Sequence, residues 1–273
     1  MTDFAPGQIP AALSRLATLK LSSPADHVLL VTLNRPQALN VFNTEMEEDM
    51  GRVMQWADDD RYIWVVVLTG AGSAFCAGGD LKPALAAIHT GGPSAPVPPS
   101  VFFGATDNGF GYLSRRPSGV KPIIAAVNGL TVGGGIEIVL NCDLVVASEK
   151  ARFGLVEVKS GLVAVHGAIP RLARVAGHQL ASEGYLRGRT LSAQEASARF
   201  GFINRVVPED QVLPAAIDMA NQAVASAITA GRAALRNDPS SEVMGQALEA
   251  IRIMKRRLIE SRNLGAVESP AKL

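Results

Sequence analysis

Residues 121–143 read KPIIAAVNGLTVGGGIEIVLNCD and indicate a buried strand, a turn and a helix in direct succession. The run from Ile123 to Val127 is short and aliphatic, which is typical of a strand covered on both faces. Three glycines at 133–135 then lead into an apolar helical segment. A helix that begins at Gly134 presents unpaired N–H groups and the positive end of its dipole, which suits an anion or a developing oxyanion.

Two glutamates lie in apolar surroundings 20 residues apart, at Glu137 and Glu157. Glu137 has aliphatic neighbours on both sides, and desolvation there would raise its pKa toward a catalytic range. Glu157 follows the apolar stretch Phe153-Gly154-Leu155-Val156. Two such carboxyls are what paired acid and base chemistry requires. The alternatives are a glutamate favoured by the helix dipole at 137 and a solvent-facing turn residue at 157, and spacing alone does not bring the two together.

A second glycine-rich tract, LTGAGSAFCAGGD, occupies residues 68–80. A dinucleotide-binding fingerprint would place glycines at 70, 72 and 75, but position 75 is Phe, which disfavours a nicotinamide-dependent oxidoreductase. The small residues Ala77-Gly78-Gly79 instead let a ligand touch the backbone, so that free N–H groups point into a pocket. The alternative is a plain tight turn.

Further strands are predicted at Val28–Leu33, Ile63–Leu68 and Leu144–Ala147. Helical patterns between the strands indicate α/β layering, with capping boxes predicted at Thr44–Glu47 and Ser192–Glu195. A Pro- and Gly-rich connection spans 83–122, and helical signals dominate from about residue 178. We therefore expect an α/β core over residues 1–190 and a helical C-terminal region over 191–273. That region includes the apolar stripe Met244, Ala247, Leu248, Ile251, Met254 and Leu258.

Composition excludes several classes of protein. The chain has 273 residues, with 26 Lys and Arg against 25 Asp and Glu, a net charge of +1 that favours neither nucleic acid nor an anionic membrane. Cys76 and Cys142 have no metal-ligand spacing and form no disulfide framework, so we expect no metal and a reducing compartment. Neither a signal peptide nor an apolar run of membrane-spanning length is expected.

The final tripeptide, Ala271-Lys272-Leu273, resembles the S-K-L peroxisomal address with Ala in place of Ser. In a eukaryotic chain it predicts peroxisomal localisation through a peroxisomal import receptor. The alternative is a chance tripeptide and a cytoplasmic protein. Deleting the tripeptide should send a fluorescent fusion to the cytosol if the address operates.

Together these stretches resemble the crotonase superfamily, in particular its enoyl-CoA hydratases. The resemblance extends from about Val28 to Val207 and includes Leu33 to Asn40, the Ala-Gly-Gly-Asp tract, the triple glycine and Asn141-Cys142-Asp143. It implies a core of repeated ββα units in a spiral, and a helical C-terminal region that forms trimers or dimers of trimers. It also implies an acyl-CoA thioester substrate and no separate cofactor, since coenzyme A is carried by the substrate.

Carried over by position, the resemblance implies a role for eight residues. The backbone N–H groups of Gly79 and Gly134 would form the oxyanion hole for the thioester carbonyl. Glu137 and Glu157 would be the two catalytic acids. The substrate-binding residues would be Ala77, whose carbonyl meets the adenine amino group, with Ala38 along the coenzyme and Asp80 and Leu81 lining the site.

The implied reaction is water addition across the 2,3-double bond of a 2-enoyl-CoA, with Glu157 exchanging a proton with carbon and Glu137 holding the water. Rival hypotheses are double-bond isomerisation, dehydration of a hydroxyacyl-CoA, thioester hydrolysis, and non-catalytic acyl-CoA binding. The chain departs from common hydratases after Glu157. Val165 replaces a frequent glycine, and His166 is interpreted as a structural histidine bonded to the backbone rather than a catalytic group. These differences favour a branched or otherwise non-standard acyl group.

Overall fold

The computed structural model describes residues 8–80, 108–116 and 121–234. Its larger sheet has six strands in the order β1-β2-β3-β5-β7-β10. All neighbours in it run parallel except the edge pair β1 and β2. The strands span Leu19–Ala25 (β1), Val28–Leu33 (β2), Val65–Gly70 (β3), Ile123–Val127 (β5), Leu144–Ser148 (β7) and Arg205–Val207 (β10).

A second sheet of four short strands adjoins the first, in the order β4-β6-β8-β9. Its strands β4, β6 and β8 pair in parallel, whereas β9 pairs antiparallel with β8. They span Ala74–Cys76 (β4), Leu130–Val132 (β6), Arg152–Gly154 (β8) and Thr190–Ser192 (β9). Both sheets are therefore mixed, and the α/β class predicted from the sequence is confirmed.

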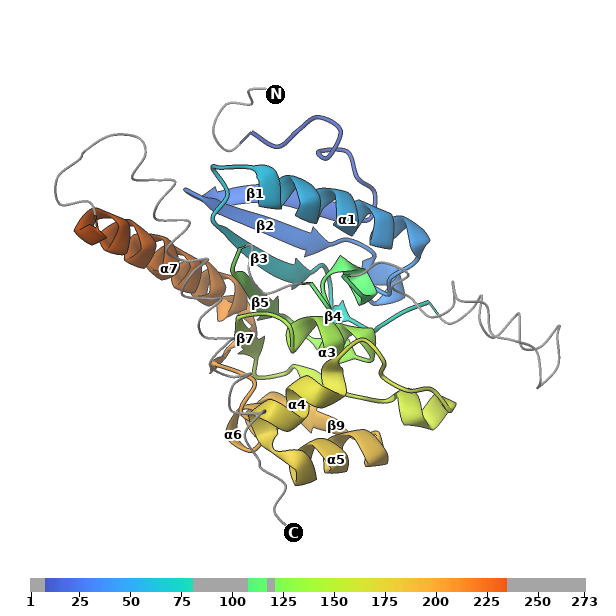
Figure 1. Cartoon of the computed structure of the whole chain (residues 1–273). Helices are drawn as coiled ribbons and strands as arrows, with labels where there is room; N and C mark the ends of the chain where they lie inside the picture. The colour runs from blue at the N-terminus through green and yellow to red at the C-terminus, as the bar shows by residue number, and fades with distance from the viewer. Residues whose placement is uncertain (1–7, 81–107, 117–120, 235–273) are drawn as a thin grey trace, which may run out of the picture.

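The large sheet is covered on both faces, as Figure 1 shows. Along β5, Ile123, Ala125 and Val127 join the core beneath α1 (Thr44–Asp59), because side chains alternate across a strand. Ile124 and Ala126 point the other way, into a second core with α7 (Val212–Ala234). The helix α7 supplies every fourth residue to that core: Val212, Ala216, Ala220 and Val224.

The helix α1 begins where the sequence predicts, but its cap is different. Asn43, not Thr44, is the N-cap, and its side chain accepts a hydrogen bond from the Met46 N–H at 3.0 Å. The Glu47 carboxylate does not close a capping box. It accepts a hydrogen bond from the Gly111 N–H at 3.0 Å instead and so holds η3 (Phe110–Tyr112) against α1.

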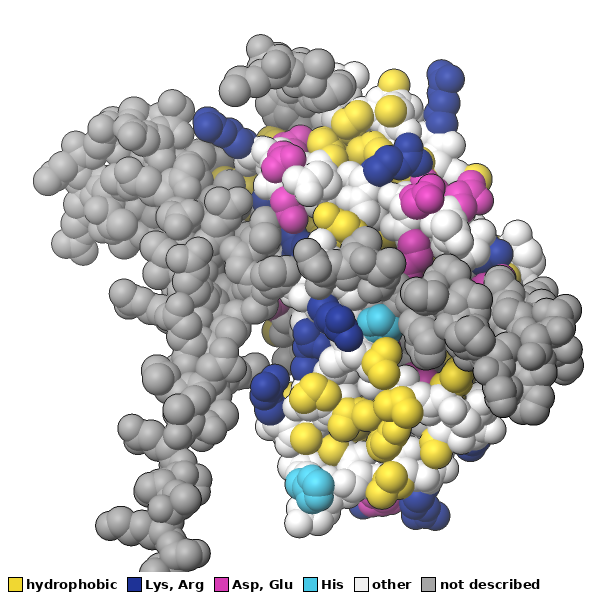
Figure 2. Space-filling view, turned by 45° about the vertical axis from the view of Figure 1, so that its right-hand side comes forward, with side chains coloured by type: hydrophobic (Ala, Val, Ile, Leu, Met, Phe, Trp, Pro, Cys, Tyr) yellow, Lys and Arg dark blue, Asp and Glu magenta, His cyan; other side chains and the backbone are white. Residues whose placement is uncertain are grey.

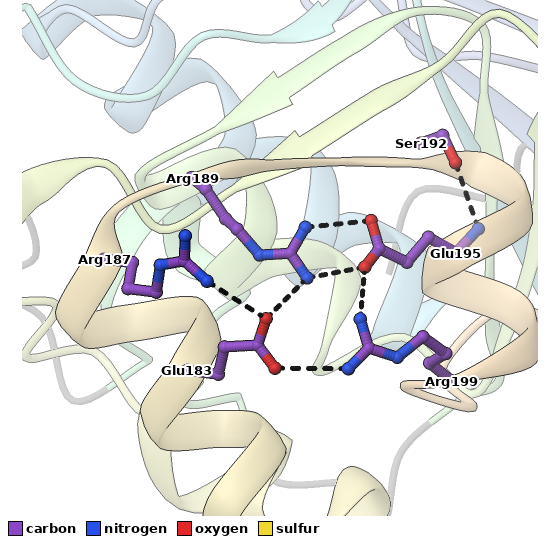
Figure 3. A network of polar contacts seen from close by, with 6 residues as sticks. All are labelled: Glu183, Arg187, Arg189, Ser192, Glu195 and Arg199. Carbon is purple, nitrogen blue, oxygen red and sulfur yellow. Dashed lines mark hydrogen bonds and ion pairs between the residues drawn. The ribbon is translucent and has the colours of Figure 1, made fainter.

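The helices α5 (His178–Arg187) and α6 (Ala193–Ala198) meet around β9, where Figure 3 shows a network of ion pairs. Arg189 contacts Glu183 at 2.9 Å and both carboxylate oxygens of Glu195. Arg199 contacts the same two glutamates at 3.2 and 2.7 Å. Ser192 caps α6 as predicted, since its hydroxyl accepts from the Glu195 N–H at 3.1 Å.

Two predicted strands, 28–33 and 123–127, have the observed bounds. The strand expected at 63–68 lies at Val65–Gly70, and β7 extends one residue beyond the prediction. The weakening of strand signals after residue 178 was misleading, because β9 and β10 lie there with three residues each. The shorter elements are α3 (Gly134–Val139), α4 (Ala168–Ala176), η1 (Pro36–Ala38), η4 (Glu157–Ser160) and η5 (Glu209–Gln211).

Several predictions concern residues outside the described ranges and stay predictions. These are Leu81, most of the connection 83–122, the apolar stripe 244–258 and the tripeptide 271–273. Within 8–80, 108–116 and 121–234, no helix is long and apolar enough to cross a membrane. In the same ranges no group of three or more His, Cys, Asp or Glu side chains is arranged to hold a metal ion.

Candidate active site

A cavity of about 140 Å³ lies where residues 77–79, which follow β4, meet the first turn of α3 and the segment 156–166. Five of the residues proposed from the sequence line it: Ala77, Gly79, Gly134, Glu137 and Glu157. The structure therefore brings together the two glycine tracts and both glutamates, which spacing alone left apart.

The N–H group of Gly79 points away from the segment with which this residue pairs. Phe42 pairs with it as an isolated parallel bridge, in which the Phe42 N–H donates to the Gly78 carbonyl and the Asp80 N–H donates to the Phe42 carbonyl, both at 2.9 Å. Because successive N–H groups of an extended chain point to opposite sides, the Gly79 N–H is directed away from Phe42. It has no acceptor among the described residues.

Gly134 is the first residue of α3, so its N–H has no acceptor within the helix. A Cβ atom at this position would lie 2.4 Å from a ring carbon of Phe110, so no larger residue fits. A Cβ atom at Gly78 would lie 3.4 Å from the Gly134 nitrogen, so the two glycine tracts are in direct contact. Two backbone N–H groups that have no acceptor among the described residues thus border one cavity.

Glu137 is almost completely buried, with 2% of its surface exposed. Its Oε1 atom accepts hydrogen bonds from the N–H groups of His166 at 2.8 Å and Ala168 at 3.4 Å. Burial raises the pKa of Glu137 to about 7, and repulsion from Glu157 adds to the rise despite these two hydrogen bonds. At neutral pH this carboxyl is poised to take or give a proton.

Glu157 begins η4 and is held differently from Glu137. Its Oε2 atom is buried and has no hydrogen-bond partner among the described residues. Its Oε1 atom lies 3.7 Å from the point where a Cβ of Gly133 would be, so the carboxyl group faces the glycine tract. Burial raises the pKa of Glu157, opposed by a hydrogen bond to its own backbone.

Two arginines fix the segment that carries His166. Arg115 donates from Nη2 to the Val165 carbonyl at 2.6 Å, and Arg171 donates from Nη1 to the His166 carbonyl at 3.4 Å. Neither arginine is predicted as a site residue from the sequence. Arg115 lies in the Pro- and Gly-rich connection, where no periodicity marks a structural residue, and Arg171 looks like any polar residue of an amphipathic helix.

The interpretation of His166 as a structural histidine bonded to the backbone was wrong for its ring. The residue is 8% exposed and lines the cavity, and its Nδ1 atom has no hydrogen-bond partner among the described residues. Its hydrogen bonds among the described residues are made by the backbone, through the N–H that holds Glu137 and the carbonyl that accepts from Arg171.

Two proposed substrate-binding residues, Ala38 and Asp80, do not line the cavity. Ala38 is the last residue of η1, and the neighbouring Leu39 carbonyl accepts a hydrogen bond from the Ala77 N–H at 3.0 Å. Asp80 directly follows Gly79. Both are therefore close to residues that line the cavity without lining it themselves.

The mouth of the cavity is apolar. Val163 and Val165 line it while remaining 56% and 45% exposed. Figure 2 shows hydrophobic side chains gathered on the lower part of one face, at the height of α4 and α5 in Figure 1.

The sequence of this chain is similar to those of known proteins. The family model described as "Enoyl-CoA hydratase/isomerase" matches residues 24–263. The chain is 48% identical over 192 residues to a mevalonyl-coenzyme A hydratase of Beauveria bassiana, covering 69% of this chain and 66% of the relative, just under two thirds. It is 44% identical over 200 residues to a mevalonyl-coenzyme A hydratase of Aspergillus fumigatus, covering 73% of this chain and 70% of that one.

Solved structures of similar sequence share the fold. An enoyl-CoA hydratase from Mycobacterium tuberculosis superposes with a TM-score of 0.65 at 31% identity, over 86% of this chain and 88% of that one. A carnitinyl-CoA hydratase from Mycobacterium avium gives a TM-score of 0.65 at 33% identity, over 90% of both chains.

Proposed function

Because this chain belongs to the enoyl-CoA hydratase/isomerase family, we propose that it is a hydratase-type lyase that adds water across, or removes it to form, the 2,3-double bond of an acyl-CoA thioester. The observation that carries the proposal is one cavity lined by two carboxyl groups, Glu137 and Glu157, and by two backbone N–H groups without an acceptor among the described residues. Isomerisation needs only one acid to move a proton between carbons, so the presence of both glutamates favours hydration or its reverse.

The two acids divide the work according to how each is held. Two backbone N–H groups fix one oxygen of Glu137, which suits it to hold a water molecule and to take its proton as the oxygen attacks C3. Glu157 has a buried oxygen without a partner among the described residues, which suits it to give a proton to C2. In the reverse direction Glu157 takes the C2 proton and Glu137 returns one to the departing hydroxyl.

The charge that develops during this step lies on the thioester oxygen. The N–H groups of Gly79 and Gly134 would donate to that oxygen and stabilise the enolate-like intermediate. In comparable sites one such donor contributes about 3 kcal/mol to transition-state stabilisation. No side chain is required for this role, which accounts for glycine at a position where a Cβ would collide with Phe110.

The substrate we favour has a branched acyl chain that keeps a hydroxyl group. Two relatives are described as mevalonyl-CoA hydratases, and the mevalonyl group bears a methyl and a hydroxyl at C3 and a second hydroxyl at C5. Gain or loss of water between C2 and C3 would interconvert such an ester with a 3-methyl-2-enoyl-CoA. The valine at 165 and the aliphatic wall of the cavity suit a branched chain.

Coenzyme A would lie against Ala77, with Ala38, Asp80 and Leu81 beside it, as the family resemblance implies. We further propose that the chain assembles as a trimer or a dimer of trimers, and that the stripe 244–258 packs in that assembly. Light scattering of the purified full-length protein tests the assembly, and a monomer at micromolar concentration would contradict it.

The test of the activity is the loss of enoyl-thioester absorbance when the protein meets a series of 2-enoyl-CoA esters. The series includes a straight four-carbon chain, a long chain, and a 3-methyl chain with a terminal hydroxyl. We expect rapid loss with the branched hydroxylated ester, and no loss with Glu137→Gln, which keeps the shape of the side chain but cannot take a proton. The variant serves as the matched control for spontaneous or contaminating activity.

No loss with any ester, despite saturable binding of the esters, would contradict the hydratase proposal. Equal loss with the wild-type protein and Glu137→Gln would remove Glu137 from the mechanism.

A further inference from the structure

We propose that His166 determines substrate specificity, by hydrogen bonding of its imidazole to a hydroxyl group of the acyl chain. This inference rests on the proposed function, because it concerns the acyl group of the same CoA thioester. It goes further in assigning the recognition of that hydroxyl to one side chain, outside the pair of acids and the two glycines.

The first support is the unpaired state of the ring. His166 is only 8% exposed, and its Nδ1 atom has no hydrogen-bond partner among the described residues. Burying a polar atom without a partner costs free energy, so such atoms in native proteins are usually paired with protein, water or ligand. His166 is one of the residues that line the cavity, so we assign a bound acyl group as that partner, reached when the ring turns its Nδ1 atom toward it.

The second support is the contrast between His166 and the wall around it. Leu162, Val163 and Ala164, on the same segment, present aliphatic side chains to the cavity. Ser160 also lines the cavity but is exposed, so water satisfies its hydroxyl. Apart from the two catalytic acids, His166 is thus the buried polar side chain of this cavity within the described residues.

The third support is position. Phe110, whose ring lies against Gly134, is also a neighbour of His166, with ring centroids 6.3 Å apart. Phe110 therefore lies between His166 and Gly134, so a group bound at the histidine would lie apart from a thioester oxygen held by Gly134. The His166 N–H already binds Glu137, which fixes the backbone from which the ring projects.

The protonation state suits a neutral hydroxyl. Burial and the nearby charge of Arg115 lower the pKa of His166 to about 4, so the ring is neutral near pH 7. A neutral imidazole has one donor and one acceptor nitrogen, and a hydroxyl can meet either. An acyl chain without the hydroxyl leaves the Nδ1 atom unpaired in the complex, and this is how such a site discriminates.

The experiment compares two esters that differ by one oxygen: a 3-methyl-2-enoyl-CoA with a terminal hydroxyl at C5, and the same ester without it. The readout is the ratio of their kcat/KM values. His166→Leu removes both nitrogens, and His166→Asn, which has nearly the same shape as Leu, restores polar atoms near the Nδ1 position. We expect the ratio to fall by about 10- to 100-fold in His166→Leu and to recover in part in His166→Asn. Val165→Ala, which alters the same cavity without removing a polar group, should leave the ratio within about threefold of the wild-type value.

Three results would overturn the inference: an unchanged ratio in His166→Leu, an equal fall for both esters, or no difference between the Leu and Asn variants. Failure of the proposed function is recognised separately, by a wild-type protein that turns over neither ester. In that case calorimetric binding of the two corresponding saturated esters carries the test. A wild-type preference for the hydroxylated ester that His166→Leu abolishes supports the inference, and no preference overturns it.

Discussion

Two pairs of glutamates in this molecule have opposite surroundings. Glu183 and Glu195 each contact two or more arginines in the network around β9. Glu137 and Glu157 line the cavity, and no Lys or Arg of the described residues forms an ion pair with either. Ion pairing with Arg189 lowers the pKa of Glu195, whereas burial raises that of both cavity glutamates.

Under the proposed function, this difference separates a pair that serves stability from a pair that serves chemistry. Charged Glu195 is favoured by the fold, so it contributes to stability but has no tendency to exchange a proton at neutral pH. Charged Glu137 is disfavoured by the fold, so it weakens the native state above its pKa. A fold retains such a residue where proton transfer requires it.

The largest effect is expected from replacing Glu157, the proposed proton donor to C2. Its buried Oε2 atom has no partner among the described residues. Glu157→Gln should lower turnover by about 10²- to 10⁴-fold, because an amide cannot exchange a proton with C2. Binding of the CoA ester should stay within a few-fold of wild type, since the amide keeps the shape of the side chain. Steady-state kinetics and calorimetric titration measure the two quantities.

Glu195→Gln is the matched control, since it makes the same chemical change in the arginine-paired glutamate. Its turnover should stay close to that of the wild-type protein. Turnover by Glu157→Gln at the wild-type rate would show that the unpaired oxygen has no part in the reaction.

The next effect is on stability and depends on pH. The pKa of Glu137 rises from a usual value near 4.5 to about 7, which corresponds to about 3 kcal/mol. A raised pKa gives stability that is fully present below pH 4.5 and is lost as pH rises through 7. Glu137→Gln abolishes that loss, and its amide oxygen can still accept from His166 and Ala168. Denaturant unfolding should therefore show the variant gaining on the wild-type protein between about pH 5 and pH 8.5 by an amount of this order.

Glu195→Gln should show the opposite trend. Its folded pKa is lowered, so the carboxylate contributes stability above about pH 4.5 that disappears as pH falls through the lowered value. A Glu137→Gln variant that loses stability relative to the wild-type protein as pH rises would contradict this account of Glu137. In that account, its charge is buried and forms no ion pair with a Lys or Arg of the described residues.

Much of the fold was predictable because the central strands are marked by uninterrupted aliphatic runs. Ile123 to Val127 is buried on both faces, so the length of the aliphatic run placed its ends. Strands of three residues, such as β9 and β10, carry too few side chains to show a pattern. The cap of α1 was misplaced by one residue because Asn43 and Thr44 are both good caps, and the choice depends on backbone angles that sequence does not reveal.

The site was predictable as a set of residues but not as a set of contacts. The family resemblance singled out the glycine tracts and the glutamates, which taken alone would also suit a tight turn, a dipole-favoured helix residue and a solvent-facing turn residue. The contacts of His166 were not predictable. Its backbone N–H donates to Glu137, whereas its ring Nδ1 atom has no partner among the described residues. The contacts of Arg115 and Arg171 join segments far apart in the chain, and a single sequence carries no signal for such pairs.

The smallest effect is expected in the arginine network. At neutral pH and low salt, Glu195→Gln should lower the free energy of unfolding by about 1 kcal/mol, because its ion pairs are still partly exposed and so gain little over hydrated ions, even within a network. The backbone N–H at position 195 would still donate to the Ser192 hydroxyl in this variant, so the cap of α6 is retained. Denaturant titration at low and high salt measures the loss, which should shrink as salt screens the charges.

Glu209→Gln breaks the isolated and more exposed pair with Lys150 and should cost still less, because a network holds its charges in place and a lone pair does not. If Glu195→Gln were as costly as a buried cavity, or insensitive to salt, the network would act through packing rather than charge. Glu195 and Glu137 would then differ only in how deeply each is buried. Ion pairing with arginine would not explain the effect of either glutamate on stability.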